Sequence, residues 1–195
     1  MNAKGIRVVG IAIACILLIC GGFYLFSQNL NSGNPDQLTE VQKIVVKDLK
    51  NDYPETPREV VKFYNRIMQA YHTENLKKED LGKLVDQMML LWDKDLLAKN
   101  SRDSYYAEVT ADIKLYKQLK KSIMSITIAD SKDVVEITDD RNGDKLAFVD
   151  TTYFVNTDGK FTNSHMRVGL RKDEDGKWKI IGVTLKEGAS SKDDK

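Results

Sequence analysis

The sequence predicts an α+β protein in which one N-terminal transmembrane helix is followed by helices packed on a curved antiparallel β-meander. Three observations support this prediction. Residues 8–26 form an apolar run without charge, residues 36–121 carry apolar side chains at helical spacing, and the apolar period falls to two from residue 124 onward. One exported domain behind a single membrane anchor is therefore expected.

The apolar run Val8–Phe26 would span roughly 28 Å as a helix, which matches the hydrocarbon thickness of a bilayer. Lys4 and Arg7 precede the run, and the first acid after it is Asp36. The positive-inside rule therefore places residues 1–7 in the cytoplasm. The predicted product is a single-pass cell membrane protein that contacts lipid through Val8–Phe26 and has an extracytoplasmic C-terminal domain.

A cleaved signal peptide and a lipoprotein are the alternatives. A signal peptide has an apolar region of about 7–15 residues and ends in a small-x-small site. The run in this chain is longer and ends in bulky residues, and a lipid on Cys15 would leave the apolar residues 16–26 beyond the modified cysteine. An uncleaved anchor is therefore predicted. The predicted segments are residues 1–7 (cytoplasmic), 8–26 (anchor), 27–51 (spacer and juxtamembrane helix), 52–187 (extracytoplasmic α+β domain) and 188–195 (disordered tail).

Composition restricts the classes of partner. The chain has 30 basic and 29 acidic residues, and its outer part is close to neutral because Lys4 and Arg7 are the only charges before residue 27. A neutral domain has no overall field for nucleic acid or anionic lipid, so no nucleic-acid partner is predicted. Both cysteines, Cys15 and Cys20, lie in the apolar run, which leaves the outer domain without a disulfide. The sequence indicates no cofactor.

Four helices are predicted before the sheet. Thr56 is an expected N-cap, Pro57 occupies the first helical position, and Glu59 completes a capping box at the start of the second helix. The apolar spacing of each segment predicts amphipathic helices that bury one face. The predicted ranges are residues 36–51, 57–73, 78–99 and 104–121.

The second half of the domain predicts an antiparallel meander. Asn142-Gly143, Asp158-Gly159 and Asp175-Gly176 each lie between period-two segments. These dipeptides accept positive φ and match the twist of hairpins, so they predict three hairpin turns. The predicted strands are residues 124–128, 134–138, 146–155, 161–171 and 178–185.

The segments TPREVVKFYNRIMQAY and DGKWKIIGVTL are similar to the first helix and last strand of the nuclear transport factor 2-like and polyketide cyclase-like superfamily. Residues 52–185 more closely resemble an uncharacterised family of membrane-anchored proteins of anaerobic Gram-positive bacteria. The segments that carry this likeness are YPETPREVVKFYNRIM, LLWDKDLLAKN and RKDEDGKWKI. The resemblance implies a cone-like domain with one mouth, and it implies no particular chemistry.

A pocket in such a cone would make Asp150, Tyr153 and His165 the candidates for catalysis. A carboxylate inside a cone would have a raised pKa and would suit a general base, and some enzymes of the resembled superfamily combine such an acid with a tyrosine. The alternative is that Asp150 lies on the solvated face beside Thr152 or pairs with a cation. The two isolated histidines, His72 and His165, do not make a metal site.

The predicted function is that of a membrane-anchored extracytoplasmic binding or assembly module without catalytic activity. Its partner would be a protein or a small hydrophobic ligand, and the pair Gly10 and Ala14 in the anchor is compatible with a homodimer. The alternative is a cyclase- or isomerase-like enzyme that uses Asp150. Aromatic side chains at helical spacing would either line a ligand cavity or fill the core. These residues are Tyr64, Trp92, Tyr105, Tyr106 and Tyr116.

Overall fold

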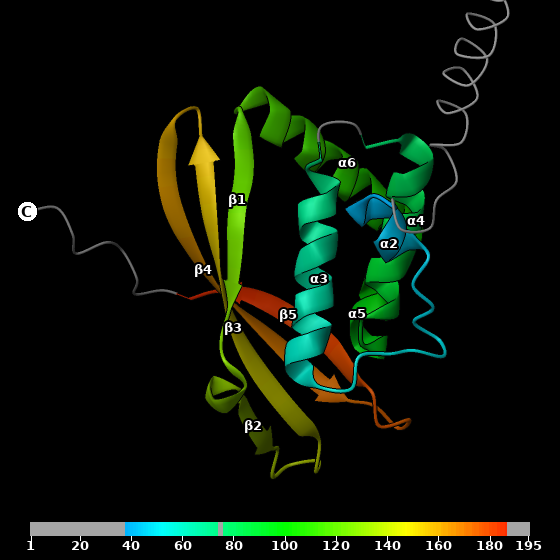
Figure 1. Cartoon of the computed structure of the whole chain (residues 1–195). Coiled ribbons are helices and arrows are strands. Elements are labelled where there is room, and N and C mark those ends of the chain that lie inside the picture. Colours follow the sequence, from blue (N-terminus) through cyan, green and yellow to red (C-terminus); the bar gives the residue numbers. More distant parts are fainter. Residues whose placement is uncertain (1–37, 74–75, 187–195) are drawn as a thin grey trace, which may run out of the picture. The chain divides into compact units, whose positions relative to one another are not determined.

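The computed structural model describes residues 38–73 and 76–186. The predicted cytoplasmic segment, anchor and tail lie outside these ranges, as do residues 27–37. No helix inside the described ranges is long and apolar enough to cross a membrane. Five α-helices pack on an antiparallel sheet in the described part (Figure 1), which confirms the predicted α+β class. The elements are α2 (Glu40–Val45), α3 (Pro57–Tyr71), α4 (Lys78–Leu90), α5 (Lys94–Lys99), α6 (Arg102–Gln118), β1 (Lys121–Ile128), the 3-10 turn η2 (Ser131–Asp133), β2 (Val135–Thr138), β3 (Lys145–Thr157), β4 (Lys160–Lys172) and β5 (Trp178–Leu185).

The sheet has the strand order β1-β3-β4-β5, and β2 pairs with β3 beside β1. β1 and β2 therefore occupy successive halves of the same edge of β3. Asp158 and Gly159 have φ values of 49° and 86° and form a two-residue turn between the paired residues Thr157 and Lys160. Gly143 and Gly176 also have positive φ, so all three turn predictions are confirmed.

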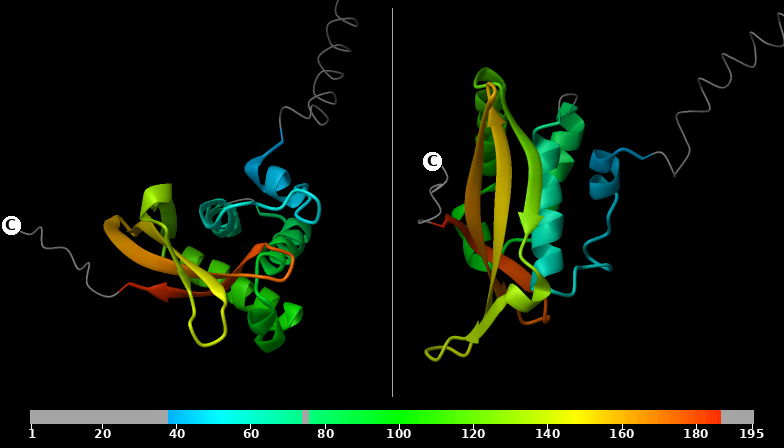
Figure 2. Two further views of the ribbon diagram at one scale, coloured as in Figure 1. Left: turned by 90° about the horizontal axis from the view of Figure 1, so that it is seen from below. Right: turned by 60° about the vertical axis from the view of Figure 1, so that its left-hand side comes forward.

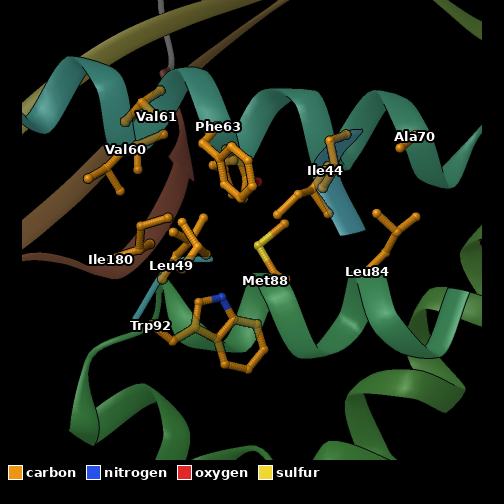
Figure 3. Close-up of a cluster of buried hydrophobic side chains, with 14 of the residues drawn as sticks. Ile44, Leu49, Val60, Val61, Phe63, Ala70, Leu84, Met88, Trp92 and Ile180 are labelled. Atoms are coloured by element: carbon orange, nitrogen blue, oxygen red, sulfur yellow. The ribbon is translucent and has the colours of Figure 1, made fainter. Parts of the chain in front are cut away.

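The helices pack against one face of the sheet, here called the inner face, as the two views of Figure 2 show. Figure 3 shows the core between α3 and α4, where Phe63, Met88 and Trp92 meet Ile180 of β5. Burial of each large apolar side chain there stabilises the fold by about 1.5–3 kcal/mol. β3 contributes alternate residues to this core or its edge, namely Ala147, Val149, Thr151, Tyr153 and Val155.

The capping box predicted for α3 is present. The Thr56 hydroxyl accepts a hydrogen bond from the Glu59 backbone N–H at 3.2 Å, and the Glu59 carboxylate accepts one from the Thr56 backbone N–H at 3.2 Å. These two bonds satisfy donors that a helix N-terminus otherwise leaves free. The short local motif thus positions α3 at its first residue, and α3 supplies the buried Asn65 described below.

The helix predicted over residues 36–51 is wrong in extent, because in the described part of this segment, residues 38–51, only α2 is helical. The Gln87 side chain of α4 donates hydrogen bonds to the carbonyls of Val45 and Lys47, at 3.2 and 2.8 Å. The Asp48 carboxylate accepts from the backbone N–H of Lys50 at 3.0 Å and forms a turn. The hydrogen bonds from Gln87 of a distant helix and the local turn at Asp48 therefore end α2 early.

The single helix predicted over residues 78–99 is also wrong, because the chain leaves the helical path between α4 and α5. Trp92 forms a parallel bridge with Ile180 of β5. The Ile180 N–H donates to the Leu91 carbonyl at 2.8 Å, and the Asp93 N–H donates to the Ile180 carbonyl at 2.9 Å. The Asp93 side chain then caps α5 by accepting from the Asp95 N–H at 2.9 Å.

The boundary between the last helix and the first strand differs from the prediction of residues 104–121 and 124–128. Ser101 caps α6, and Lys120, with a φ of 47°, turns the chain into β1. A β-bulge follows at Ile123 and Ser125, so Ile123 and Ile126 lie on the inner side and Met124 is exposed. A strict period of two cannot reveal such an insertion.

Candidate functional site

Asp150 lies in the middle of β3 on the face that points away from the helices, here called the outer face. Its Oδ1 accepts from Arg167 Nε at 2.7 Å, and its Oδ2 accepts from Arg167 Nη2 at 2.9 Å and from Lys186 Nζ at 2.7 Å. The paired hydrogen bonds from Arg167, helped by Lys186, lower the pKa of Asp150 to about 2. A carboxylate held by two cations is a poor proton acceptor near neutral pH.

Tyr153 lies on the inner face, three residues along the same strand from Asp150, and the sheet separates the two side chains. Its hydroxyl donates to Asn65 Oδ1, and burial raises its pKa. The Asn65 amide donates to Thr151 Oγ1 at 3.0 Å, and that hydroxyl donates to the Thr127 carbonyl at 3.0 Å. This buried chain of hydrogen bonds links α3, β3 and β1 and satisfies its own polar groups.

His165 shares the outer face with Asp150 but belongs to the neighbouring cross-strand pair. Its Nδ1 lies 3.0 Å from Thr152 Oγ1, whereas Asp150 is paired across the strands with Arg167. The structure thus places two of the three candidates on the outer face and leaves Tyr153 on the other side. No candidate acid, base and tyrosine converge on one cavity in this arrangement, although convergence is what a cyclase-like site requires.

Of the aromatic residues predicted either to line a cavity or to fill the core, Tyr64 and Trp92 are buried in the core, and Tyr105 and Tyr106 pack against it. The Trp92 and Tyr105 rings meet edge to face with centroids 4.4 Å apart, and the Tyr71 and Tyr105 hydroxyl oxygens lie 3.4 Å apart. Burial raises the pKa of Tyr64 to about 12. His72 stacks on Tyr116 with centroids 3.7 Å apart. These contacts fill space between the helices, which is the core role.

A groove of about 600 Å³ lies where α4 and α5 meet the turn between β4 and β5. Its walls carry Arg171 and Asp93, whose side chains form an ion pair. The Arg171 guanidinium also contacts Asp95 and, at 3.2 Å, Asp144. The charged groups of this Arg171 cluster satisfy one another, so the cluster offers no unpaired charge to a ligand.

The outer face carries exposed apolar side chains over β2 and the adjoining part of β3. Val135 and Ile137 of β2 are 49 % and 47 % exposed, and they pair with Phe148 and Leu146 of β3. Gly169 of β4 lies beside them, and a Cβ at this position would be only 3.3 Å from Ile181 and 3.5 Å from Phe148. We call this surface the apolar sheet patch. It consists of Val135, Ile137, Leu146, Phe148 and Ile181.

Alternation in the sequence places Asp150 on the same face as Leu146 and Phe148, and the structure confirms this grouping. The alternation did not reveal which face the helices cover, because both faces of β3 carry apolar residues. The apolar sheet patch was missed for this reason. The usable sequence signal was the alternation of Val135 and Ile137 with polar residues in β2, which gives this strand one apolar face.

Within the described residues, no group of three or more His, Cys, Asp or Glu side chains is arranged to hold a metal ion.

A family model described as Domain of unknown function (DUF6715) matches residues 1–183. The chain belongs to this family. The match includes the apolar run at residues 8–26 and continues through most of β5. The family model therefore covers both the apolar run and the domain that the structure describes. No curated protein matches the chain.

Proposed function

We propose that the chain is a single-pass membrane protein whose extracytoplasmic domain is a non-catalytic binding or assembly module with a nuclear transport factor 2-like cone. The uncharged run at residues 8–26 behind Lys4 and Arg7 supports the anchor and its orientation. The family match, which includes this run, supports its being an integral part of the protein. Long helices on a bulged antiparallel sheet support the cone.

The absence of catalysis is supported by the environments of the candidate residues. Asp150 is held by Arg167 and Lys186, and its lowered pKa is opposite to the raised pKa that a carboxylate base needs. Tyr153 is buried and bonded to Asn65 on the opposite face. A binding role requires no such convergence of acid and base.

The observation that carries the proposal is the apolar sheet patch. Exposed apolar side chains that lie together on a sheet mark surfaces that other molecules cover. The patch is a sheet surface whose partly buried members, Phe148 and Ile181, pack over Gly169. Such a surface suits a protein partner better than a small ligand, because small ligands bind in concave cavities. The proposed partner is therefore another envelope protein.

Photocrosslinking in the native cell tests this proposal. A benzophenone amino acid at Ile137 should give a crosslinked product of defined mass, and the same probe at the exposed Glu108 of α6 should not. Phe148→Asp should remove the product while the domain stays folded. External protease should digest the domain in intact spheroplasts. Identical products from both probe positions, or a protected domain, would contradict the proposal.

A further inference from the structure

One end of the domain is built from the α6–β1 corner and the β3–β4 turn. The Lys120 carbonyl accepts a hydrogen bond from the Asp158 N–H at 3.2 Å, and Lys120 Nζ lies 3.1 Å from Asp158 Oδ1. These contacts hold the corner and the turn together, and both lie at the upper end of the sheet in Figure 1. We call this end the tip and define it as residues 114–124 and 154–163.

The tip exposes apolar side chains. Phe161, Met124 and Phe154 are 57 %, 52 % and 38 % exposed, and the two phenylalanine rings stack with centroids 5.4 Å apart. Leu115 and Leu119 of α6 are also exposed. Five of the eleven large hydrophobic side chains exposed in the described residues thus lie at one end, which marks the tip as an interaction surface.

The tip is also basic. It contains five lysines and one acid, Asp158, which pairs with Lys120. Lys121 lies with its ammonium group 4.4 Å from the centre of the Tyr116 ring. The other lysines make no ion pair with any residue of the described ranges. They are Lys114, Lys117 and Lys160.

The opposite end of the domain is acidic. β3 runs toward the tip and β4 runs away from it, so the turns at residues 139–144 and 173–177 lie at the far end (Figure 1). These turns contain six acids and two bases. The outer domain is nearly neutral as a whole, but its charges are separated between its two ends. A negatively charged surface would therefore attract the tip more strongly than the far end, where Arg171 pairs with Asp144 and Lys94 pairs with Glu174.

We propose that the tip docks on the anionic lipid headgroups of the bilayer that anchors the chain. Phe154 and Phe161 enter the interface, and the lysines contact lipid phosphates, a combination that holds peripheral segments on membranes. This inference rests on the proposed function, because it takes residues 8–26 as the anchor. The eleven residues 27–37 between the proposed anchor and the described domain can span at most roughly 40 Å, about the diameter of a domain of this size. Chain length alone therefore limits how far the domain can lie from the proposed membrane surface.

Depth-dependent quenching in vesicles tests the docking. The full chain with Cys15→Ser and Cys20→Ser receives one bimane-labelled cysteine, by Asn163→Cys in the tip or by Asp140→Cys at the far end as the matched control. Both proteins are reconstituted in phosphatidylglycerol–phosphatidylcholine vesicles that contain headgroup-level nitroxide lipids. We expect about twofold quenching of the tip label and little quenching of the far-end label.

One double variant and one change of lipid separate the contributions of the phenylalanines and the lysines. Phe154→Ser with Phe161→Ser should reduce quenching of the tip label to the far-end level, and these exposed positions do not disturb the core. Vesicles of phosphatidylcholine alone should also reduce it, because the lysines lose their anionic partners. Equal quenching of both labels in chains that resist alkaline extraction would overturn the docking and leave the anchor intact.

Alkaline extraction of the same vesicles reports on the anchor separately. If the chain is extracted, the proposed function fails, and flotation with phosphatidylglycerol vesicles then judges the tip alone. Flotation that the double serine variant loses would retain the tip as a lipid-binding surface. Absence of flotation would overturn it.

Discussion

Replacement of Arg171 by methionine should destabilise the domain by about 3 kcal/mol. Arg171 lies on β4, and its guanidinium contacts both oxygens of Asp93, whose side chain is only 4 % exposed. Removal of one member of a buried pair costs about 3–5 kcal/mol because the remaining charge is uncompensated. Arg171 is itself one-fifth exposed, which places the cost at the low end. Asp93 also caps α5, so the break between α4 and α5 should loosen.

Arg167→Met provides a matched control on the same strand. Arg167 makes the same two-pronged contact with Asp150, but both side chains are more than one-third exposed, and exposed pairs contribute about 0–1 kcal/mol. Urea unfolding of residues 38–195, followed by the fluorescence of Trp92 and Trp178, measures both variants. Equal costs for the two variants, or a cost below about 1 kcal/mol for Arg171→Met, would refute the reasoning.

Three further predictions concern burial and pH. Trp178→Ala should cost about 3–5 kcal/mol in the same urea assay, because the ring is 5 % exposed on the inner face; a loss below about 1 kcal/mol would contradict this. Burial lowers the pKa of His72, so stability should fall as pH drops below about 6.5, and His72→Phe should remove that slope; an unchanged slope would count against it. The pKa of Asp150 is lowered to about 2, so its contribution is present above about pH 4 and is lost toward pH 2. Asp150→Asn should therefore reduce the loss of unfolding free energy between about pH 4 and pH 2 by about 1 kcal/mol, a small value because solvent screens this partly exposed pair. An unchanged dependence of stability on pH in this window would argue against the pairing.

The parts of the fold that local chemistry determines could be predicted from the sequence. The capping box at Thr56 and Glu59 located the start of α3, and Asp158-Gly159 located the turn between the two longest strands. Each of these signals involves residues within four positions of one another, so no distant contact is needed to interpret them.

The errors occurred where distant residues determine the backbone. Helical spacing continues through Trp92, but the backbone of Ile180 forms hydrogen bonds with the Leu91 carbonyl and the Asp93 N–H. These bonds replace helical ones and interrupt the helix. Gln87 ends α2 in the same way from a different helix. Propensity describes the local preference of a segment, and such tertiary hydrogen bonds override it.

The candidate site shows the same division. The sequence indicated that Asp150 either pairs with a cation or lies in a pocket, and Arg167 is its cross-strand neighbour. The pairing partner depends on strand register, which a sequence period does not specify. The charge separation between the tip and the far end was also hidden, since a net charge near zero says nothing about where the charges lie.

The two edges of the sheet affect whether crowded copies of this domain can aggregate by pairing their strands. An open strand edge is a template on which another chain can add a strand, and this is how many β proteins aggregate. One edge is divided between β1 and β2, with a bulge at Ile123 and Ser125, and the other is partly occupied by the bridge from Trp92 to Ile180. Neither edge therefore offers a long, flat row of backbone donors and acceptors. Copies of this domain concentrated side by side would resist strand addition and could remain separate molecules.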